Sequence, residues 1–157
     1  MAIERERKFL VKDNSWRELA GAGVKYRQGY IYSDENKSIR IRISNSDALL
    51  NIKSGALEGD ATARLEYEYA IPLSDAEEML ENLCGTQRLE KTRYKISYEG
   101  NIWEVDEFSE ANQGLVMAEV EFEEKNQSIK LPLWIGEEVT EDKRYTNAEL
   151  AKKPYIT

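Results

Sequence analysis

The sequence predicts a mainly β domain of the α+β kind, in which about eight strands form an antiparallel barrel or sandwich. Apolar and polar residues alternate in segment after segment, which is the periodicity of a strand with one apolar face. These segments mostly follow one another across short turns, and few helices are available for parallel crossovers. The 157 residues contain no repeat, low-complexity tract or linker, so we expect a single domain over residues 1–157.

The amino-terminal half supplies most of the expected strands. Residues 2–10 alternate as a strand, and residues 13–20 form a short helix whose Ser15 and Glu18 have capping-box spacing. Two alternating runs around the turn-like sequence DENK predict a hairpin. A glycine-bearing loop, GALEGDA, then leads to a strand that is closed by Pro72. The strands after the first are expected at 26–33, 38–44, 48–54 and 63–73.

The clearest helix is expected over residues 74–85. Ser74 and Glu77 have capping-box spacing, and Gly85 stops the helix. The lone cysteine, Cys84, lies at the end of this helix and is expected to be a small core residue. The apolar stripe of the helix consists of Met79, Leu80 and Leu83.

The carboxyl-terminal half continues the strand pattern. Residues 88–108 form two strands around a turn at 99–101, and residues 115–123 form the last confident strand. The tail contains the apolar sequence LPLW. It ends in a short helix over 146–154, which Thr146 caps and a proline terminates.

Composition excludes several classes of function. The chain has no histidine, which removes Ser-His and Cys-His catalysis and imidazole-bound zinc, and it has no P-loop. A net charge of −8 argues against nonspecific nucleic-acid binding. No apolar run approaches the ~20 residues of a membrane span, and the start lacks the apolar core of a signal peptide. Because one cysteine cannot form an intrachain disulfide, we expect a cytoplasmic protein without a membrane partner.

Each expected strand has one apolar and one charged face. A sandwich with a charged outside and a wide barrel with a charged, wet inside both give this pattern. The charges are sorted by sign, with Glu4 beside Glu6 and Arg40 beside Arg42. Such pairs gain nothing on a solvated face, because like charges at alternate positions repel. Carboxylates bind hard divalent cations and guanidinium groups bind phosphate oxygens, so the pattern suits a metal–polyphosphate complex.

The segment Glu4-x-Glu6-x-Lys8 resembles the ExExK signature of the CYTH superfamily, the triphosphate tunnel metalloenzymes. Further matches run in order along nearly the whole chain, and this order is far more specific than ExExK alone in a glutamate-rich protein. The chain is most similar to the short bacterial members, which hydrolyse inorganic tripolyphosphate. The matching segments are RQGYI, IRIR, NIKS, EYE, EKTRY, WEVDEF, AEVEFE and EEVTEDKRYTNAELA.

This resemblance implies an eight-stranded antiparallel β-barrel that forms a charged tunnel, with a few short helices packed outside. It also implies divalent-metal-dependent hydrolysis of inorganic triphosphate to pyrophosphate and phosphate, and an all-oxygen site favours Mg²⁺ or Mn²⁺. The partner would be tripolyphosphate or another triphosphate-bearing small molecule. Both a monomer and a homodimer remain open.

Other functions compatible with the resemblance are adenylate cyclase and thiamine triphosphatase. Both need a pocket for an organic group, and cyclase members often carry a histidine near the amino-terminal motif, which this chain lacks. A non-catalytic barrel that binds polyphosphate is a further alternative. So many carboxylates are of little use to a pure anion binder, which favours an enzyme.

The resemblance also assigns roles to individual residues. Glu4 and Glu6 would bind or orient a second metal and the attacking water, and Lys91 would lie near the reacting phosphoryl or leaving group. Lys143 or Arg144 would close one mouth of the tunnel. The residues that would hold the first metal against the triphosphate are Asp106, Glu119 and Glu121. Those that would bind phosphate oxygens are Lys8, Arg40, Arg42, Lys53 and Arg93.

Overall fold

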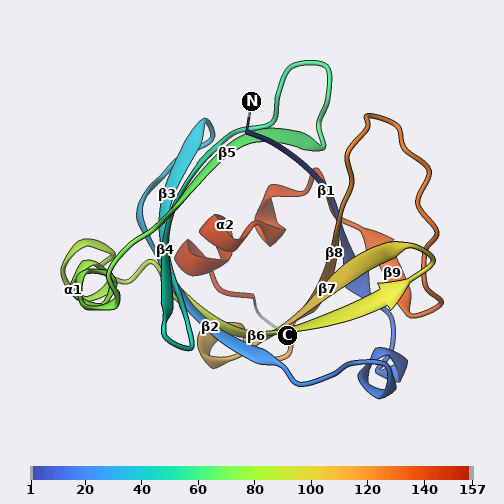
Figure 1. Cartoon of the computed structure of the whole chain (residues 1–157), viewed down its shortest axis with the longest axis horizontal. Helices are drawn as coiled ribbons and strands as arrows, with labels where there is room; N and C mark the ends of the chain where they lie inside the picture. The colour runs from blue at the N-terminus through green and yellow to red at the C-terminus, as the bar shows by residue number, and fades with distance from the viewer. Residues whose placement is uncertain (1, 156–157) are drawn as a thin grey trace.

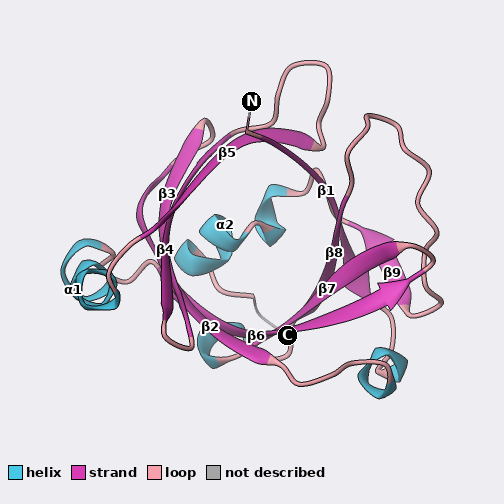
Figure 2. Ribbon diagram, in the orientation of Figure 1, coloured by secondary structure: helices cyan, strands magenta, loops and turns pink. Residues whose placement is uncertain are grey.

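The computed structural model describes residues 2–155, and it forms a closed antiparallel β-barrel (Figures 1 and 2). The wall runs in the order β1, β5, β4, β3, β2, β6, β7 and β8, and β8 pairs with β1 to complete the ring. The eight-stranded barrel expected from the resemblance is therefore confirmed. The wall strands are β1 (Ile3–Val11), β2 (Val24–Ser33), β3 (Lys37–Ser44), β4 (Asp47–Ser54), β5 (Ala63–Ala70), β6 (Arg88–Tyr98), β7 (Asn101–Phe108) and β8 (Val116–Glu121).

Strand β1 closes the barrel by pairing differently along its two edges. On one edge it pairs with β8, from Glu6 opposite Glu121 to Leu10 opposite Met117. On the other edge, three residue pairs join Ile3–Arg5 to β5, whereas eight pairs join β3 to β4. We call this short join the β1–β5 seam. Beyond it, the additional strand β9 (Ile135–Glu138) pairs with the end of β1.

The outward-facing side chains form two cores on the outside of the wall. In one, Phe9 and Trp103 pack with ring centroids 5.6 Å apart and are covered by Trp16 of the 3₁₀ helix η1 (Ser15–Glu18). In the other, Ile41 and Ile43 are buried under the helix α1 (Leu73–Leu83). Because alternate residues point to opposite faces of a strand, burying these apolar residues outside the barrel directs the charged residues inward.

The start of α1 differs from the sequence prediction. The helix begins at Leu73, with Pro72 at the N-cap position, so Ser74 lies inside the first turn and the predicted capping box is wrong. The capping box at Ser15 is also wrong, because the Ser15 hydroxyl donates to Asp13. Within residues 2–155, no helix combines the length and apolar character needed to cross a membrane. The remaining helical segments are η2 (Glu110–Asn112), η3 (Lys143–Tyr145) and α2 (Asn147–Lys152).

Helix α2 occupies one end of the barrel rather than its outside (Figure 1). Its Leu150 is 2% exposed and clusters with Leu89 and Met117, which point inward from β6 and β8. The predicted cap is confirmed, because the Thr146 side chain accepts a hydrogen bond from the backbone N–H of Glu149. An apolar plug therefore closes one end of the barrel and leaves the rest of the interior polar.

Candidate active site

The barrel encloses a cavity of about 310 Å³ that we call the tunnel. All eight wall strands contribute to its lining, and the carboxyl-terminal segment adds residues from its rim and from the start of α2. The charged face of the strands is thus the inner face, which decides between the barrel and the sandwich. One lining residue from each wall strand, in chain order, is Glu6, Tyr26, Arg40, Asn51, Glu66, Lys91, Glu104 and Glu119.

An acidic group of three carboxylates lies where β1 meets β8. Each of Glu4, Glu6 and Glu121 places a carboxylate oxygen within 4.8 Å of the other two. The register explains this, because Glu6 lies opposite Glu121 and Glu4 follows on the same face of β1. Burial, with Glu119 and Glu4 nearby, raises the pKa of Glu6 to about 8. Burial, Glu4 and Glu104 likewise raise the pKa of Glu121 to about 7.

These raised pKa values predict a pH-dependent stability of the cation-free protein. Between pH 5 and 7, Glu6 and Glu121 keep protons in the folded state that they lose near pH 4.5 when unfolded. The folded state therefore binds more protons, and its stability falls as the pH rises. We expect the free energy of unfolding to drop by about 2 kcal/mol over this range, mostly through Glu6, because Glu121 is more exposed and better screened.

Urea unfolding in EDTA at pH 5, 6 and 7 measures this drop. Burial lowers the pKa of Lys91 to about 7 from an ordinary 10.5, so this group acts in the opposite sense, mainly above pH 7. Repeating the series with saturating Mg²⁺ is the control, because a bound cation removes the repulsion and with it the drop. A stability in EDTA that stays level or rises from pH 5 to 7 would contradict the arrangement of the acidic group.

The arginines of β3, Arg40 and Arg42, form a basic wall on the side of the tunnel that lies opposite the acidic group. Among residues 2–155, no carboxylate lies within 4.0 Å of the guanidinium of Arg40 or Arg42. The Nε of Arg40 is buried without a hydrogen-bond partner in this part of the chain. Arg42 donates to Gln28 at 3.0 Å, and burial together with Arg40 lowers its pKa to about 10. Such buried, uncompensated cations are suited to an anion with many acceptor oxygens.

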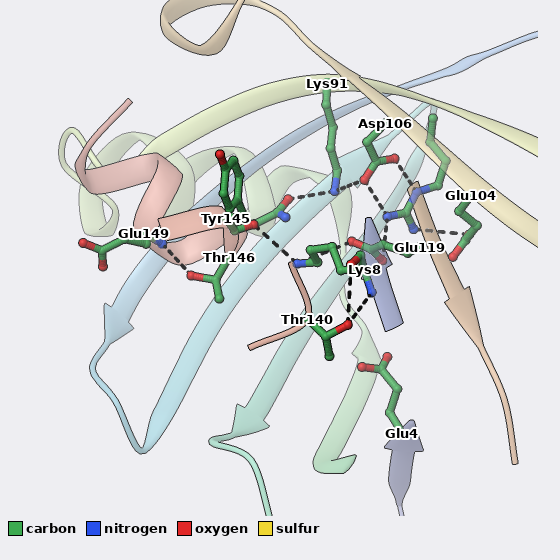
Figure 3. A network of polar contacts seen from close by, with 12 residues as sticks. Glu4, Lys8, Lys91, Glu104, Asp106, Glu119, Thr140, Tyr145, Thr146 and Glu149 are labelled. Atoms are coloured by element: carbon green, nitrogen blue, oxygen red, sulfur yellow. Dashed lines mark hydrogen bonds and ion pairs between the residues drawn. The ribbon is translucent and has the colours of Figure 1, made fainter. Parts of the chain in front are cut away.

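A buried network of ion pairs supports the floor of the tunnel (Figure 3). The Nζ of Lys91 lies 2.7 Å from Asp106 and 2.7 Å from the side-chain oxygen of Asn147. Arg93 donates to both carboxylate oxygens of the same Asp106 through one edge of its guanidinium, from Nε at 2.7 Å and from Nη2 at 2.9 Å. Arg93 also lies 3.6 Å from Glu119, which is 3.7 Å from Lys8. These pairs hold the basic side chains in fixed positions beside the cavity.

The sequence profile of the CYTH domain matches residues 2–155. The chain belongs to the CYTH family. It is 50% identical over 155 residues to a protein of Acetivibrio thermocellus named inorganic triphosphatase, covering 99% of this chain and 97% of the relative. A protein of the same name from Nitrosomonas europaea is 40% identical over 152 residues, covering 94% and 96%.

Solved structures also resemble this CYTH domain. The crystal structure of an inorganic triphosphatase aligns with a TM-score of 0.67 at 35% identity, covering 96% of this chain and 95% of the other. A protein from Hippeastrum, described as a putative adenylyl cyclase that reveals a dominant triphosphatase activity, aligns at 15% identity with a TM-score of 0.57. It covers 77% of this chain and 80% of its own, and at this identity it shows the fold alone.

Most of the residues singled out by the sequence line the tunnel of the CYTH domain. Asp106 is an exception, because it is 1% exposed and lies behind Lys91 and Arg93, which occupy its oxygens. The predicted residues that line the tunnel are Glu4, Glu6, Lys8, Arg40, Arg42, Lys53, Lys91, Arg93, Glu119 and Glu121.

Lys143 is the predicted residue that lies farthest from its expected role. Its side chain is 77% exposed and lies 3.8 Å from Glu35, outside the tunnel. Arg144 is also exposed and pairs with Asp142. The turn η3 directs both side chains outward, and the next residues, Thr146 and Asn147, face the cavity instead.

The carboxylates are grouped differently from the two predicted metal sets. Glu121 joins Glu4 and Glu6, of which Glu4 also accepts a hydrogen bond from Lys53 at 2.9 Å, whereas Glu119 and Asp106 pair with Lys8 and Arg93. Among the described residues the donor set of the acidic group is entirely carboxylate oxygen, which fits a hard cation such as Mg²⁺ or Mn²⁺.

Sequence reasoning missed three amides in and around the tunnel. Gln28 donates to Asn147 at 3.0 Å, and Asn51 donates to Glu66 and Glu68 at 3.0 and 3.1 Å. Alternation could have found Asn51, because it lies two residues before Lys53 on the same face of β4. No periodic signal could have found Asn147, whose position depends on α2 entering the barrel end.

Proposed function

We propose that this CYTH domain hydrolyses inorganic triphosphate to pyrophosphate and orthophosphate inside the barrel. The observation that carries the proposal is the polarised tunnel, in which three clustered carboxylates face arginines that have no carboxylate partner among residues 2–155. Near-full-length relatives that carry the name inorganic triphosphatase support the same activity.

The basic wall binds the substrate. Arg40 and Arg42 contact nonbridging phosphate oxygens. Lys53 reaches into the tunnel from the neighbouring strand β4, and Lys8 reaches in from β1 on the opposite side. Phosphoryl transfer mostly requires positioning and neutralisation of charge, so side chains held by ion pairs are effective. Lys91 is fixed by Asp106 and donates to an oxygen of the reacting phosphoryl or the leaving group.

Glu4, Glu6 and Glu121 of the acidic group would hold a divalent cation, Mg²⁺ or Mn²⁺. A cation there supplies charge neutralisation on the phosphate and makes an attacking water more acidic. Glu6 and Glu4 also accept hydrogen bonds from that water and orient it toward the terminal phosphorus. No histidine is required for this chemistry, in agreement with the composition.

The size of the tunnel favours a small polyanion. At about 310 Å³ it lies at the lower end of the ~300–1,000 Å³ typical of ligand sites. Its lining is dominated by charged side chains, with few apolar surfaces on which an adenine or thiazole ring could stack. The tunnel therefore suits tripolyphosphate better than ATP or thiamine triphosphate.

Phosphate release from tripolyphosphate, ATP and thiamine triphosphate, each with Mg²⁺, Mn²⁺ or EDTA, tests the proposal. We expect tripolyphosphate to be hydrolysed at least about tenfold faster than the other two, and only with a cation. Cyclic nucleotide formed from ATP would identify a cyclase instead. A melting temperature raised by tripolyphosphate without any turnover would identify a non-catalytic binder.

A further inference from the structure

The aromatic ring of Tyr26 contacts two arginines, one from each neighbouring strand. Tyr26 belongs to β2, and its side chain lines the tunnel. The ring centroid lies 4.7 Å from the guanidinium carbon of Arg42 on β3 and 5.2 Å from that of Arg93 on β6. The strand register explains both contacts, because each arginine lies diagonally opposite Tyr26, at a spacing that long side chains and aromatic rings can bridge.

Apart from this contact, the two arginines are held very differently. Arg93 is fixed by charge, because it donates to both carboxylate oxygens of the buried Asp106. Arg42 has no carboxylate within 4.0 Å among residues 2–155, and within this part of the chain its guanidinium donates only to Gln28, at 3.0 Å. The ring of Tyr26 therefore joins a firmly held arginine to one whose charge is uncompensated.

We propose that Tyr26 is a positioning residue for triphosphate binding, and that its ring orients Arg42 by packing against both Arg42 and the fixed Arg93. This inference rests on the proposed function. A carboxylate at position 26 would also orient Arg42, but it would neutralise the charge that attracts phosphate oxygens. The face of an aromatic ring attracts a guanidinium and leaves its charge and its free N–H donors to the substrate.

Repulsion between the arginines makes such a contact necessary. Burial, together with Arg40 and Arg93, lowers the pKa of Arg42 to about 10, so the neighbouring cations disfavour its charged form. The electron-rich ring of Tyr26 offsets part of this repulsion because it contacts both guanidiniums. Without the ring, Arg42 would gain rotamer freedom that has to be lost again when the substrate binds. Loss of the ring should therefore weaken binding more than it slows the chemical step.

Steady-state kinetics of Tyr26→Leu and Tyr26→Phe with tripolyphosphate and Mg²⁺ test the role. We expect Tyr26→Leu to raise KM about tenfold and to lower kcat less than about threefold, because Arg42 binds phosphate oxygens in the ground state and the transition state alike. Tyr26→Phe keeps the ring and should stay within about twofold of the wild type in both constants. Tyr32→Leu is the matched control, since Tyr32 lies on the same strand, outside the tunnel, with Lys37 at 5.4 Å from its ring.

A double-mutant cycle tests whether Tyr26 acts through Arg42. Isothermal titration of tripolyphosphate in EDTA measures binding without turnover, for the wild type, Tyr26→Leu, Arg42→Met and the double variant. We expect Tyr26→Leu to weaken binding about tenfold when Arg42 is present and less than about twofold when it has been replaced by methionine. Circular dichroism melting confirms that each variant keeps the barrel, and Tyr26→Met replaces Tyr26→Leu if the leucine variant does not fold.

Four results would each overturn the role of Tyr26. They are an unchanged Kd in Tyr26→Leu, equal losses in Tyr26→Phe and Tyr26→Leu, additive losses in the cycle with Arg42, and a raised KM in Tyr32→Leu. Failure of the proposed function gives a different result, a wild type that binds tripolyphosphate and releases no phosphate. The binding cycle in EDTA then still decides whether Tyr26 positions Arg42.

Discussion

Replacing Glu6 by glutamine is expected to abolish hydrolysis while making the cation-free protein more stable. The two effects have one cause. Glu6 is buried beside Glu4 and Glu119, so its ionised form is disfavoured and its pKa is raised to about 8. A neutral amide of the same shape removes that cost, and it also removes a carboxylate that holds the cation. Function and stability therefore oppose each other at this position.

We expect Glu6→Gln to lower turnover of tripolyphosphate by about a hundredfold or more, because a lost ligand weakens and misplaces the cation. In EDTA at pH 8 its free energy of unfolding should exceed that of the wild type by about 1–3 kcal/mol. Steady-state phosphate release and urea unfolding measure the two effects. Glu107→Gln is the matched control, since Glu107 pairs with Arg17 on the outside of β7. A variant that is both active and destabilised would contradict the role of Glu6.

Replacing Arg93 by methionine is expected to cause the largest loss of stability of any substitution in the tunnel. Its guanidinium lies within 3.6 Å of carboxylates from Asp106, Glu104 and Glu119. Without it, Asp106 keeps only Lys91, Glu119 keeps only Lys8 at 3.7 Å, and Glu104 loses its ion pair. Removing one partner from a buried ion pair costs about 3–5 kcal/mol, and we expect a loss in this range at pH 7.

Denaturant unfolding of Arg93→Met, Arg93→Lys and Arg17→Met at pH 7 tests this expectation. The lysine variant should recover part of the loss, because it restores the charge but not the two-pronged contact with Asp106. Arg17 makes an equally short pair with Glu107, at 2.6 Å, but both are exposed, so its loss should cost less than about 1 kcal/mol. Equal losses at the two positions would show that burial does not set the strength of these pairs.

Alternation alone sorts the two faces of each strand correctly but cannot say which face is inside. On β1, Glu4 and Glu6 share one face while Arg5 and Arg7 share the other, where they pair with Asp60 and Glu138. A sandwich would show the same sequence pattern. The prediction that the charged face lies inside came from the family resemblance. The structure explains it, because the apolar faces are buried under α1, η1 and β9.

The features that the sequence did not predict depend on packing between distant segments. By alternation Asp106 belongs to the inner face of β7, yet Lys91 and Arg93 lie between it and the cavity. Alternation predicts the face on which a side chain lies but not how deeply the side chain is buried. Asn147 reaches the tunnel only because α2 enters the barrel. Strand β9 lacks a clear alternation and forms because β1 leaves an edge open beyond the β1–β5 seam.

The shortness of the β1–β5 seam links cation binding to the integrity of the wall. Three residue pairs hold this join, and Glu4 is one of its members as well as a member of the acidic group. The carboxylates of that group repel one another, and among residues 2–155 Lys53 of β4 offsets part of the repulsion by pairing with Glu4 at 2.9 Å. A bound cation would remove the rest and would draw β1 and β8 together next to this join. We therefore expect removal of the cation to open the barrel at this join first, so that backbone amides of Ile3–Arg5 exchange with heavy water sooner than those of β3 and β4.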